Sequence, residues 1–256
     1  MRRFRPNVVF HLAAYKHVDW AEVYPEEFVD TNLHGSWNVL RAAEKASVDR
    51  VVVASTDKAA LAASFYGRTK RFMEQLTAFA ARRAGAHRTA VRFVNVLGSA
   101  GSASDLFLRQ ARAEVPLTVT DTGMVRYWIT MAHAATLAAH GALLAGPADP
   151  AMLTVGDLAE RIWRAAGREG DPDIHLVGIR RGETLSEVLT APGEELGEEA
   201  FQGIAPIHGE ISTAGPAWVA ERLPASGSRE EARGVWLEAM QRPGLLTPGT
   251  APTRAG

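Results

Sequence analysis

Residues 51–70 read VVVASTDKAALAASFYGRTK, and this stretch is the strongest indication of the fold in the sequence. Residues 51–55 form a short apolar run, which is typical of a buried parallel strand. Over residues 65–84 large apolar side chains recur three and four positions apart, which predicts a helix. Residues 89–95 are again apolar and predict the next strand.

The same alternation extends toward the N-terminus. Residues 8–14 are an apolar run that ends in small residues, which predicts a strand followed by a loop. Thr31 and Asn32 can cap a helix that ends near Lys45. Strand, helix, strand, helix, strand with short polar joints predicts an α/β fold with a doubly wound, Rossmann-like parallel sheet, whose ligands bind beyond the carboxyl ends of its strands.

After Gly98 the pattern becomes less regular and predicts a smaller mixed region. Helices are expected at 104–114, at 131–144 and from Thr154 to Ala166, with a strand at 175–179 and none between 145 and 154. From residue 224 onward Pro, Gly, Ser, Thr and Ala accumulate. We therefore expect a partial dinucleotide-binding domain (1–100), a substrate region (101–223) and a flexible tail (224–256).

Composition excludes several classes of protein. The 256 residues are 46% hydrophobic and carry a formal net charge of -1, so neither nucleic acid nor an anionic membrane surface is expected as a partner. No cysteine is present, so disulfides and thiolate metal sites are excluded, and we expect no metal. No apolar stretch is long enough to span a membrane, and we expect a cytoplasmic protein.

The chain has only four lysines, and three of them lie in short clusters at or just after the ends of the expected strands. These are Lys16, Lys58 and Lys70. A lysine ammonium can lose its proton when it is buried, whereas arginine stays charged, so this distribution indicates lysine chemistry. The alternative is that the few lysines of this arginine-rich chain occupy these positions by chance.

Tyr66 and Lys70 are four residues apart on a predicted helix and therefore share one face. A nearby ammonium lowers the pKa of a tyrosine toward a value at which the phenolate accepts a proton. For a Tyr-x-x-x-Lys pair alone, a solvent-exposed pair is the commoner explanation. The preceding strand, however, ends in Ser55-Thr56-Asp57-Lys58, which adds a hydroxyl, a carboxylic acid and a second amine at the same edge of the sheet.

Residues 8–189 resemble the extended short-chain dehydrogenase/reductase superfamily, and within it the polysaccharide-biosynthesis group of UDP-N-acetylglucosamine 4,6-dehydratases that invert carbon 5. The matching stretches occur in order along the chain: HLAAYKHV (11–18), TNLHG (31–35), STDKAA (55–60), YGRTK (66–70), VRFVNVLGS (91–99), RYWIT (126–130) and GIRRGETL (178–185). The most specific is Thr56-Asp57-Lys58, because the related retaining dehydratases carry a glutamate in place of Lys58.

The resemblance implies a catalytic mechanism. Tyr66, with its pKa lowered by Lys70 and by the positively charged nicotinamide, takes the proton of the sugar 4-hydroxyl while hydride passes from carbon 4 to NADP, or to NAD as the alternative. Lys58, if neutral, then removes the proton at carbon 5, and Asp57 protonates the departing 6-hydroxyl. Thr56 holds the carbonyl oxygen.

The resemblance also implies binding residues. The cofactor contacts are Ala13, Ala14, Lys16, Asn32, Tyr66 and Lys70. The UDP-sugar contacts are Lys16, Asn95, Arg126, Arg180 and Glu183. An arginine fork suits a diphosphate because it makes paired, charge-assisted hydrogen bonds. In its complete form the protein is expected to be a homo-oligomer.

Each candidate also has a simpler interpretation. Asn32 can cap a helix, Arg126 can form a surface ion pair, and Lys16 can be a solvated loop residue. His11, inside an apolar strand, is expected to be a core histidine rather than a catalyst. Asp57 and Lys58 can form an ion pair at the end of a strand.

The chain also departs from the family pattern. The family's first strand and its Gly-x-x-Gly-x-x-Gly turn are not found, since the first glycine is Gly35, so the sheet is expected to lack its first strands and to expose an apolar edge. We expect a fragment or a mis-started reading frame; a decayed relative, or a separate chain that supplies the missing half, are the alternatives. Leu61-Ala62 and Ala100 replace a usual Asn-Pro and a usual arginine.

Two other functions stay open. A nucleotide-sugar 4-epimerase or reductase would use Tyr66 and Lys70 but would not need Asp57 and Lys58. A non-catalytic binding or assembly module would keep the cleft, or an oligomer surface, without the reaction.

Overall fold

A computed structural model describes residue 1 and residues 3–139, 144–223 and 227–246. In these ranges the elements are β1 (Val8–His11), α1 (Val18–Val23), α2 (Pro25–Phe28), the π-helix η1 (Val29–His34), α3 (Gly35–Lys45), β2 (Arg50–Thr56), α4 (Lys58–Leu61), α5 (Phe65–Ala84), β3 (His87–Phe93), β4 (Asn95–Val96), α6 (Ala103–Arg112), β5 (Leu117–Val119), β6 (Val125–Ile129), α7 (Met131–Ala139), β7 (Leu144–Pro147), β8 (Ala151–Thr154), α8 (Val155–Ala165), β9 (Ile174–Leu176), β10 (Glu195–Leu196), β11 (Ile204–His208), α9 (Ala214–Arg222) and α10 (Arg229–Gln241). No helix among these described residues is long and apolar enough to cross a membrane.

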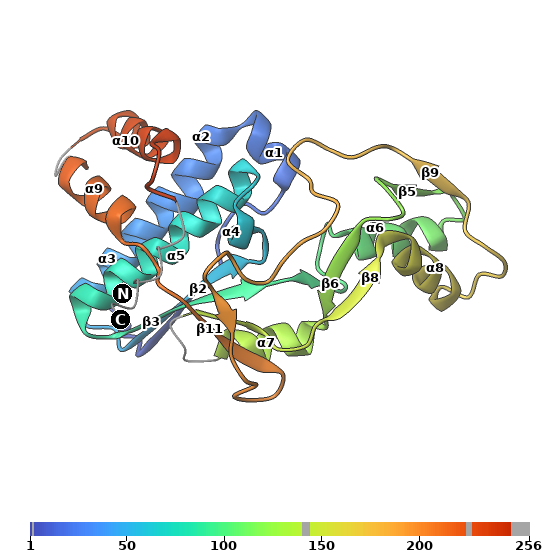
Figure 1. Cartoon of the computed structure of the whole chain (residues 1–256), viewed down its shortest axis with the longest axis horizontal. Coiled ribbons are helices and arrows are strands. Elements are labelled where there is room, and N and C mark those ends of the chain that lie inside the picture. Colours follow the sequence, from blue (N-terminus) through green and yellow to red (C-terminus); the bar gives the residue numbers. More distant parts are fainter. Residues whose placement is uncertain (2, 140–143, 224–226, 247–256) are drawn as a thin grey trace, which may run out of the picture.

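The main sheet has the order β1-β2-β3-β7-β11-β10. Its first four strands are parallel, and β11 and β10 are antiparallel to their neighbours. Figure 1 shows α3 and α5 on one side of this sheet and α7 on the other. The predicted α/β fold with a largely parallel, Rossmann-like sheet is confirmed.

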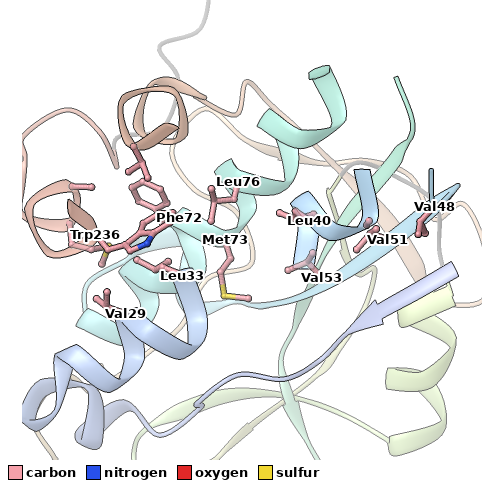
Figure 2. Packing of buried hydrophobic residues seen from close by; sticks show 14 residues of the cluster. Val29, Leu33, Leu40, Val48, Val51, Val53, Phe72, Met73, Leu76 and Trp236 are labelled. Carbon is pink, nitrogen blue, oxygen red and sulfur yellow. The ribbon is translucent and has the colours of Figure 1, made fainter. Parts of the chain in front are cut away.

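The two faces of β2 bury different neighbours because side chains alternate along a strand. Val51 and Val53 point into the cluster that includes Phe72 and Met73 of α5, as Figure 2 shows. Val52 belongs to the opposite cluster, which contains Leu137 of α7. Helices therefore cover both faces of β2, as the continuous apolar run at residues 51–55 predicted for a buried parallel strand.

Strand β1 forms a free edge of the main sheet. In the described part of the chain it pairs only with β2. Phe10 and Leu12 expose 52% and 55% of their surface, whereas Val9, between Phe10 and Val8, packs against the α3–α5 side. The expected uncovered apolar edge is present.

The second region contains two small sheets, β4-β6-β8 and β5-β9, with α6 and α8 packed against them. Our expectation of no strand between 145 and 154 is wrong, because both β7 and β8 lie there. Strand β7 reads Leu-Ala-Gly-Pro and has no large side chain beyond its first residue, so its burial leaves little trace in the sequence. Strands β7 and β11 belong to the main sheet, so part of the expected substrate region (101–223) lies in the first domain.

The helix expected to begin at Thr31 and Asn32 begins earlier. Pro25 occupies the first turn of α2, and the chain continues without a break through η1 into α3. Asn32 is therefore inside a helix rather than capping one. It is fully buried and its amide serves the backbone of Tyr15 instead.

We expected residues 224–256 to be a flexible tail, but part of this segment forms a packed helix. Helix α10 docks on the first domain, with Trp236 fully buried and its ring 5.8 Å from that of Phe72 (Figure 2). Asp30 of η1 is ion-paired with Arg229 at 2.8 Å and with Arg233 at 2.5 Å. Residues 224–226 and 247–256 of the expected tail lie outside the described residues.

A network of two arginines and two glutamates lies inside the first domain. Glu74 of α5 pairs with Arg92 of β3 at 2.8 Å and with Arg71 at 3.1 Å. Both arginines also pair with Glu194, each at 2.5 Å. All four side chains are at most 2% exposed, and Ser55 of β2 donates to Glu74 at 2.6 Å. The network thus joins α5, β2 and β3 to the loop that contains Glu194.

Removing the Trp236 side chain should reveal the contribution of α10. We expect Trp236→Ala to lower the free energy of unfolding by about 3–5 kcal/mol, because it leaves a cavity between α10 and α5. Trp20 is 53% exposed, so Trp20→Ala should change stability by no more than about 0.5 kcal/mol. Urea denaturation measures both, and equal losses would show that α10 is not docked.

Neutralising Glu74 should leave an uncompensated positive charge inside the protein. We expect Glu74→Gln to destabilise the fold by about 3–5 kcal/mol, as is usual when one member of a buried ion pair is removed. Glu160→Gln is the matched control, since Glu160 pairs with Arg164 on the surface at 3.3 Å and should contribute at most about 0.5 kcal/mol. Comparable midpoints of thermal unfolding in the two variants would contradict this expectation.

Candidate active site

A cleft of about 810 Å³ opens beyond the carboxyl ends of β1, β2 and β3, between the main sheet and the second region. Residues from both parts of the chain line it. Those that sequence analysis had singled out are Ala14, Lys16, Thr56, Asp57, Lys58, Tyr66, Lys70, Asn95, Arg126, Arg180 and Glu183. The structure thus brings the predicted residues together at the predicted edge of the sheet, while their roles stay predictions.

Two candidates for the cofactor site do not line the cleft. Ala13 lies in the exposed loop after β1. Asn32 lies behind that loop, where its Oδ1 accepts a hydrogen bond from the Tyr15 backbone at 2.8 Å and its Nδ2 donates to the Tyr15 carbonyl at 3.2 Å. Asn32 therefore shapes the loop that carries Ala14 and Lys16 instead of facing the cleft itself.

The turn from β2 into α4 places Asp57 and Lys58. Asp57 is the N-cap of α4, and its Oδ1 accepts from the Lys58 backbone at 2.9 Å and from the Thr56 hydroxyl at 2.8 Å. Helix α5 then packs closely on α4, because a Cβ at Gly67 would lie 2.4 Å from the Lys58 carbonyl oxygen. This close approach holds Tyr66, the neighbour of Gly67, at the cleft beside Lys58.

The pKa of Asp57 lies far above that of an exposed aspartate. Its side chain is fully buried, and no donor among the described residues reaches Oδ2, while the carboxyl groups of Asp57 and Glu187 hydrogen-bond to each other. Burial, together with the nearby negative charge of Glu187, raises the pKa of Asp57 to about 7, although Lys58 acts in the opposite direction. A carboxyl group with this pKa can donate a proton near neutral pH.

Lys58 lies between two carboxyl groups. Its Nζ is 3.2 Å from Asp57 Oδ1 and 2.7 Å from Glu187 Oε1. Burial alone would lower the pKa of Lys58, but these two partners outweigh it and raise that pKa above its usual value. The amine is therefore an ammonium in this structure, whereas the mechanism implied by the resemblance needs it neutral.

Sequence reasoning missed Glu187. It follows β9 in a long loop, is 4% exposed at its side chain, and also pairs with Arg126 Nε at 3.3 Å. Burial would raise its pKa, but Lys58 and Arg126 outweigh burial and lower the pKa of Glu187 to about 2. The available signal was its place just after the GIRRGETL stretch, but pairing across about 130 positions is not visible in one sequence.

Tyr66 and Lys70 share the predicted helix face, with Lys70 Nζ 5.9 Å from the centre of the Tyr66 ring. The expected lowering of the tyrosine pKa by Lys70 is not found. Burial raises the pKa of Tyr66 to about 12, and the cation that opposes this rise is Lys58. Burial also lowers the pKa of Lys70 to about 8, with Nζ donating to the Ala54 carbonyl at 2.9 Å.

The candidates for substrate binding come from two loops and two strands. Arg126 is buried, not on the surface, and donates to the Thr184 carbonyl at 2.7 Å. Arg180 pairs with Asp19 of α1 at 3.4 Å, and Glu183 accepts from the Arg180 backbone at 2.9 Å. The loop after β9 thereby reaches α1, as Figure 1 shows.

Two further candidates are tied to the backbone around the cleft. Lys16 Nζ donates to the Ala100 carbonyl at 2.6 Å, and Asn95 Nδ2 donates to the Tyr127 carbonyl at 3.0 Å. His11 lies within 2.9 Å of the Ser36 hydroxyl and is buried in the sheet, so its interpretation as a core histidine is confirmed. In the described part of the chain no group of three or more His, Asp or Glu side chains could hold a metal ion.

Residues 1–208 match the model of a family described as polysaccharide biosynthesis protein. The chain belongs to this family. It is 36% identical over 211 residues to the probable polysaccharide biosynthesis protein EpsC of Bacillus subtilis, which covers 80% of this chain and 35% of that protein. The family thus covers the whole cleft, whereas α9 and α10 lie beyond the matched residues.

Two other relatives carry enzyme names. A UDP-N-acetylglucosamine 4,6-dehydratase (inverting) of Campylobacter jejuni is 34% identical over 72% of this chain and 56% of its own length. A UDP-glucose 4-epimerase of Rickettsia canadensis is 34% identical over 75% of this chain and 60% of its own length. The chain thus spans between about a third and three fifths of the length of the curated relatives it matches.

Solved structures agree on the fold. Pen from Bacillus thuringiensis superimposes with a TM-score of 0.69 at 32% identity, covering 78% of this chain and 66% of that one. The dTDP-glucose 4,6-dehydratase DesIV from Streptomyces venezuelae, with NAD and DAU bound, superimposes with a TM-score of 0.63 at 23% identity, covering 73% and 65%. The dehydratase and epimerase relatives and DesIV thus carry the names of enzymes that act on nucleotide sugars, and the two solved structures share the fold of this chain.

The contact between α4 and α5 can be tested with a single methyl group. We expect Gly67→Ala to destabilise the fold by about 1–3 kcal/mol, because its Cβ meets the Lys58 carbonyl and forces the helices apart. Gly234→Ala in α10 is the control: nothing lies within 4 Å of its Cβ, so it should be neutral or stabilise by up to about 1 kcal/mol. Thermal unfolding of both variants measures the difference, and a stable Gly67→Ala protein would contradict the close packing.

Proposed function

We propose that this chain carries the catalytic cleft of a sugar-nucleotide dehydratase that removes water from a UDP-N-acetylhexosamine. The observation that carries the proposal is the fully buried Asp57 carboxyl, with a pKa of about 7, beside Lys58 and Tyr66 in one cleft. Water elimination from a sugar needs an acid for the departing hydroxyl and a base for the neighbouring carbon. An acid and a candidate base are adjacent here.

A nicotinamide cofactor would supply the redox part of this reaction, by accepting hydride from carbon 4 of the sugar and returning it to carbon 6. The donors at the cleft fit the nicotinamide end of such a cofactor, since the Lys70 amine and the Tyr66 phenol adjoin the loop with Ala14 and Lys16. Asn32 would fix that loop through Tyr15. We propose NADP, with NAD as the alternative, since the structure of DesIV contains NAD.

Asp57 would act as the general acid. Its carboxyl group shares a hydrogen bond with Glu187, and its pKa of about 7 leaves a large fraction protonated at neutral pH. Thr56 donates to the other oxygen and thereby keeps the carboxyl group oriented. Tyr66 would exchange a proton with the sugar 4-hydroxyl, which requires its pKa to fall from the value that burial imposes.

Lys58 would act as the base at carbon 5 only after it has lost a proton. Its Nζ faces the cleft with 22% of the side chain exposed, so the amine can reach a bound sugar. The UDP group would bind beyond it, where Arg126 and Arg180 line the same cleft. Both guanidinium groups can pair with a diphosphate, with Lys16, Asn95 and Glu183 nearby.

A 4-epimerase is the second candidate, because a relative at 34% identity carries that name. An epimerase would use Tyr66 and a cofactor but would have no need for a buried acid. A non-catalytic module would need neither proton transfer nor hydride transfer. Asp57 therefore favours the dehydratase over both alternatives.

The test is to incubate the purified chain with UDP-N-acetylglucosamine and NADP, and then with NAD, and to follow the nucleotide sugar by mass spectrometry. We expect a product lighter by one water. The rate should rise about tenfold per pH unit up to about pH 7 and then level off, because the reactive site needs Asp57 protonated and Lys58 neutral. That form carries one proton fewer than the site at low pH, and as many as the site with ionised Asp57 beside the Lys58 ammonium. A product of unchanged mass that is the 4-epimer would support the epimerase, and no conversion would count against both enzymes.

Variants separate the steps. Lys58→Ala and Asp57→Asn should each lower water elimination by at least about 10²-fold, which is a typical contribution of general acid-base catalysis. Oxidation at carbon 4, followed by the absorbance of the reduced cofactor, should persist in both. Lys45→Ala is the matched control because Lys45 is exposed at the end of α3, far from the cleft lining. Elimination that survives the loss of Lys58 would exclude it as the base.

A further inference from the structure

Glu187 lies at the centre of a cluster of polar groups that come from three separate elements. Its Oε1 is 2.7 Å from Lys58 Nζ of α4 and 3.3 Å from Arg126 Nε of β6. Asn95 Nδ2 of β4 donates to its Oε2 at 3.4 Å. With only 4% of its side chain exposed, Glu187 can be ionised only because these partners replace water.

Asp57 is less well provided with partners. Its Oδ1 faces the Lys58 ammonium and two other donors, whereas no donor in the described part of the chain reaches its buried Oδ2. The carboxyl groups of Asp57 and Glu187 also hydrogen-bond to each other, so the two groups share a proton. Lys58 is thus shared by two buried carboxyl groups with unequal support. The titratable or charged groups that face this pair are Lys58 from α4, Tyr66 from α5, Arg126 from β6, and Asp57 and Glu187 themselves.

We propose that Glu187 is a positioning residue, which holds the Lys58 ammonium beside Asp57 and thereby leaves the proton of the carboxyl pair on Asp57. The inference takes its reaction from the proposed function. Its electrostatic content rests on the geometry of Glu187, Lys58 and Asp57, and can be tested without any turnover.

Two buried carboxyl groups that share one ammonium do not ionise equally. The better-supported group ionises first, and its charge then disfavours ionisation of the other. Glu187 has Arg126 and Asn95 in addition to Lys58, so it is the anion. The pKa values follow this order, since the pKa of Glu187 is lowered to about 2 and that of Asp57 is raised to about 7.

The two carboxyl groups therefore have different roles. Glu187 is the anion and fixes Lys58 in place, whereas Asp57 is the group that keeps the proton and can donate it. The same contact keeps the amine of Lys58 protonated in the resting site. A base at this position would therefore have to transfer a proton, or move away from Glu187, before it could act.

The first experiment measures the proton on Asp57 directly. Protein with ¹³C-labelled aspartate carboxyl groups is titrated by NMR, and the Asp57 signal is assigned by its loss in Asp57→Asn. We expect a midpoint near pH 7 in the unmodified chain. In Glu187→Gln we expect a midpoint at least about one pH unit lower, which is a tenfold stronger acid.

Three comparisons make this result decisive. Glu195→Gln removes an exposed carboxylate of β10, just beyond the loop that contains Glu187, and should leave the Asp57 midpoint unchanged. Glu187→Asp keeps the charge but shortens the side chain, so its midpoint should lie between those of the unmodified chain and Glu187→Gln. A midpoint that stays at the unmodified value in Glu187→Gln, or in Glu187→Asp if only that variant folds, would overturn the proposal.

Turnover gives a second readout that a purely structural role would not change. In Glu187→Gln the pH at which kcat for water elimination levels off should move to lower values by the same amount as the Asp57 midpoint, while KM changes less than kcat. Glu187→Asp should restore part of the shift. Absence of elimination in the unmodified chain would contradict the proposed function, while the NMR titration would still test Glu187. An unchanged pH profile of kcat in Glu187→Gln would overturn the role of Glu187.

Discussion

The buried pairing of Arg71 and Arg92 with Glu74 and Glu194 is the interaction on which the cleft depends. Two positive and two negative charges lie where water cannot reach them, so the positions of all four are constrained together. Glu74 also accepts from Ser55, the residue before Thr56. Arg92 donates to the Leu189 carbonyl, two residues after Glu187. One network therefore fixes both the end of β2 and the loop that faces it.

This arrangement explains why two carboxyl groups so close together differ in pKa. Asp57 reaches the cleft from β2, where the strand ends in a tight turn and burial leaves one oxygen without a donor. Glu187 reaches it from the opposite loop, where Arg126 supplies a second cation. Environments that push the pKa values of neighbouring titratable groups apart are typical of acid-base sites. The difference comes from the elements that carry the two groups and not from the groups themselves.

The sequence predicted the parts of the fold in which local pattern and tertiary burial agree. Helix 65–84 has the predicted bounds, because Ser64 caps one end and Gly85 adopts a left-handed conformation at the other. Strand β7 was missed because its small residues carry no periodic signal. An amphipathic pattern over residues 230–240 is visible in the sequence, but the proline and glycine around it led us to expect a flexible tail instead of the docked helix α10. Arg92 inside an apolar strand was a readable sign that a buried carboxylate must lie nearby, but its partners could not be identified without the fold.

The electrostatics of the cleft are harder to read from sequence because burial outweighs pair interactions there. Tyr66 and Lys70 are on one helix face as predicted, yet the pKa of the phenol rises, since burial outweighs the nearby Lys58 ammonium. For Asp57 the same burial has a cost for the fold. Its pKa in the folded chain exceeds that of an exposed aspartate, so its contribution to stability is greatest at low pH and is lost as the pH rises through about 7. A protein that buries an acid under this penalty, and leaves one of its oxygens without a donor, gains nothing in stability from it. The proton it retains is of use only if something in the cleft accepts it, and a departing hydroxyl group meets that requirement where a simple epimerisation would not.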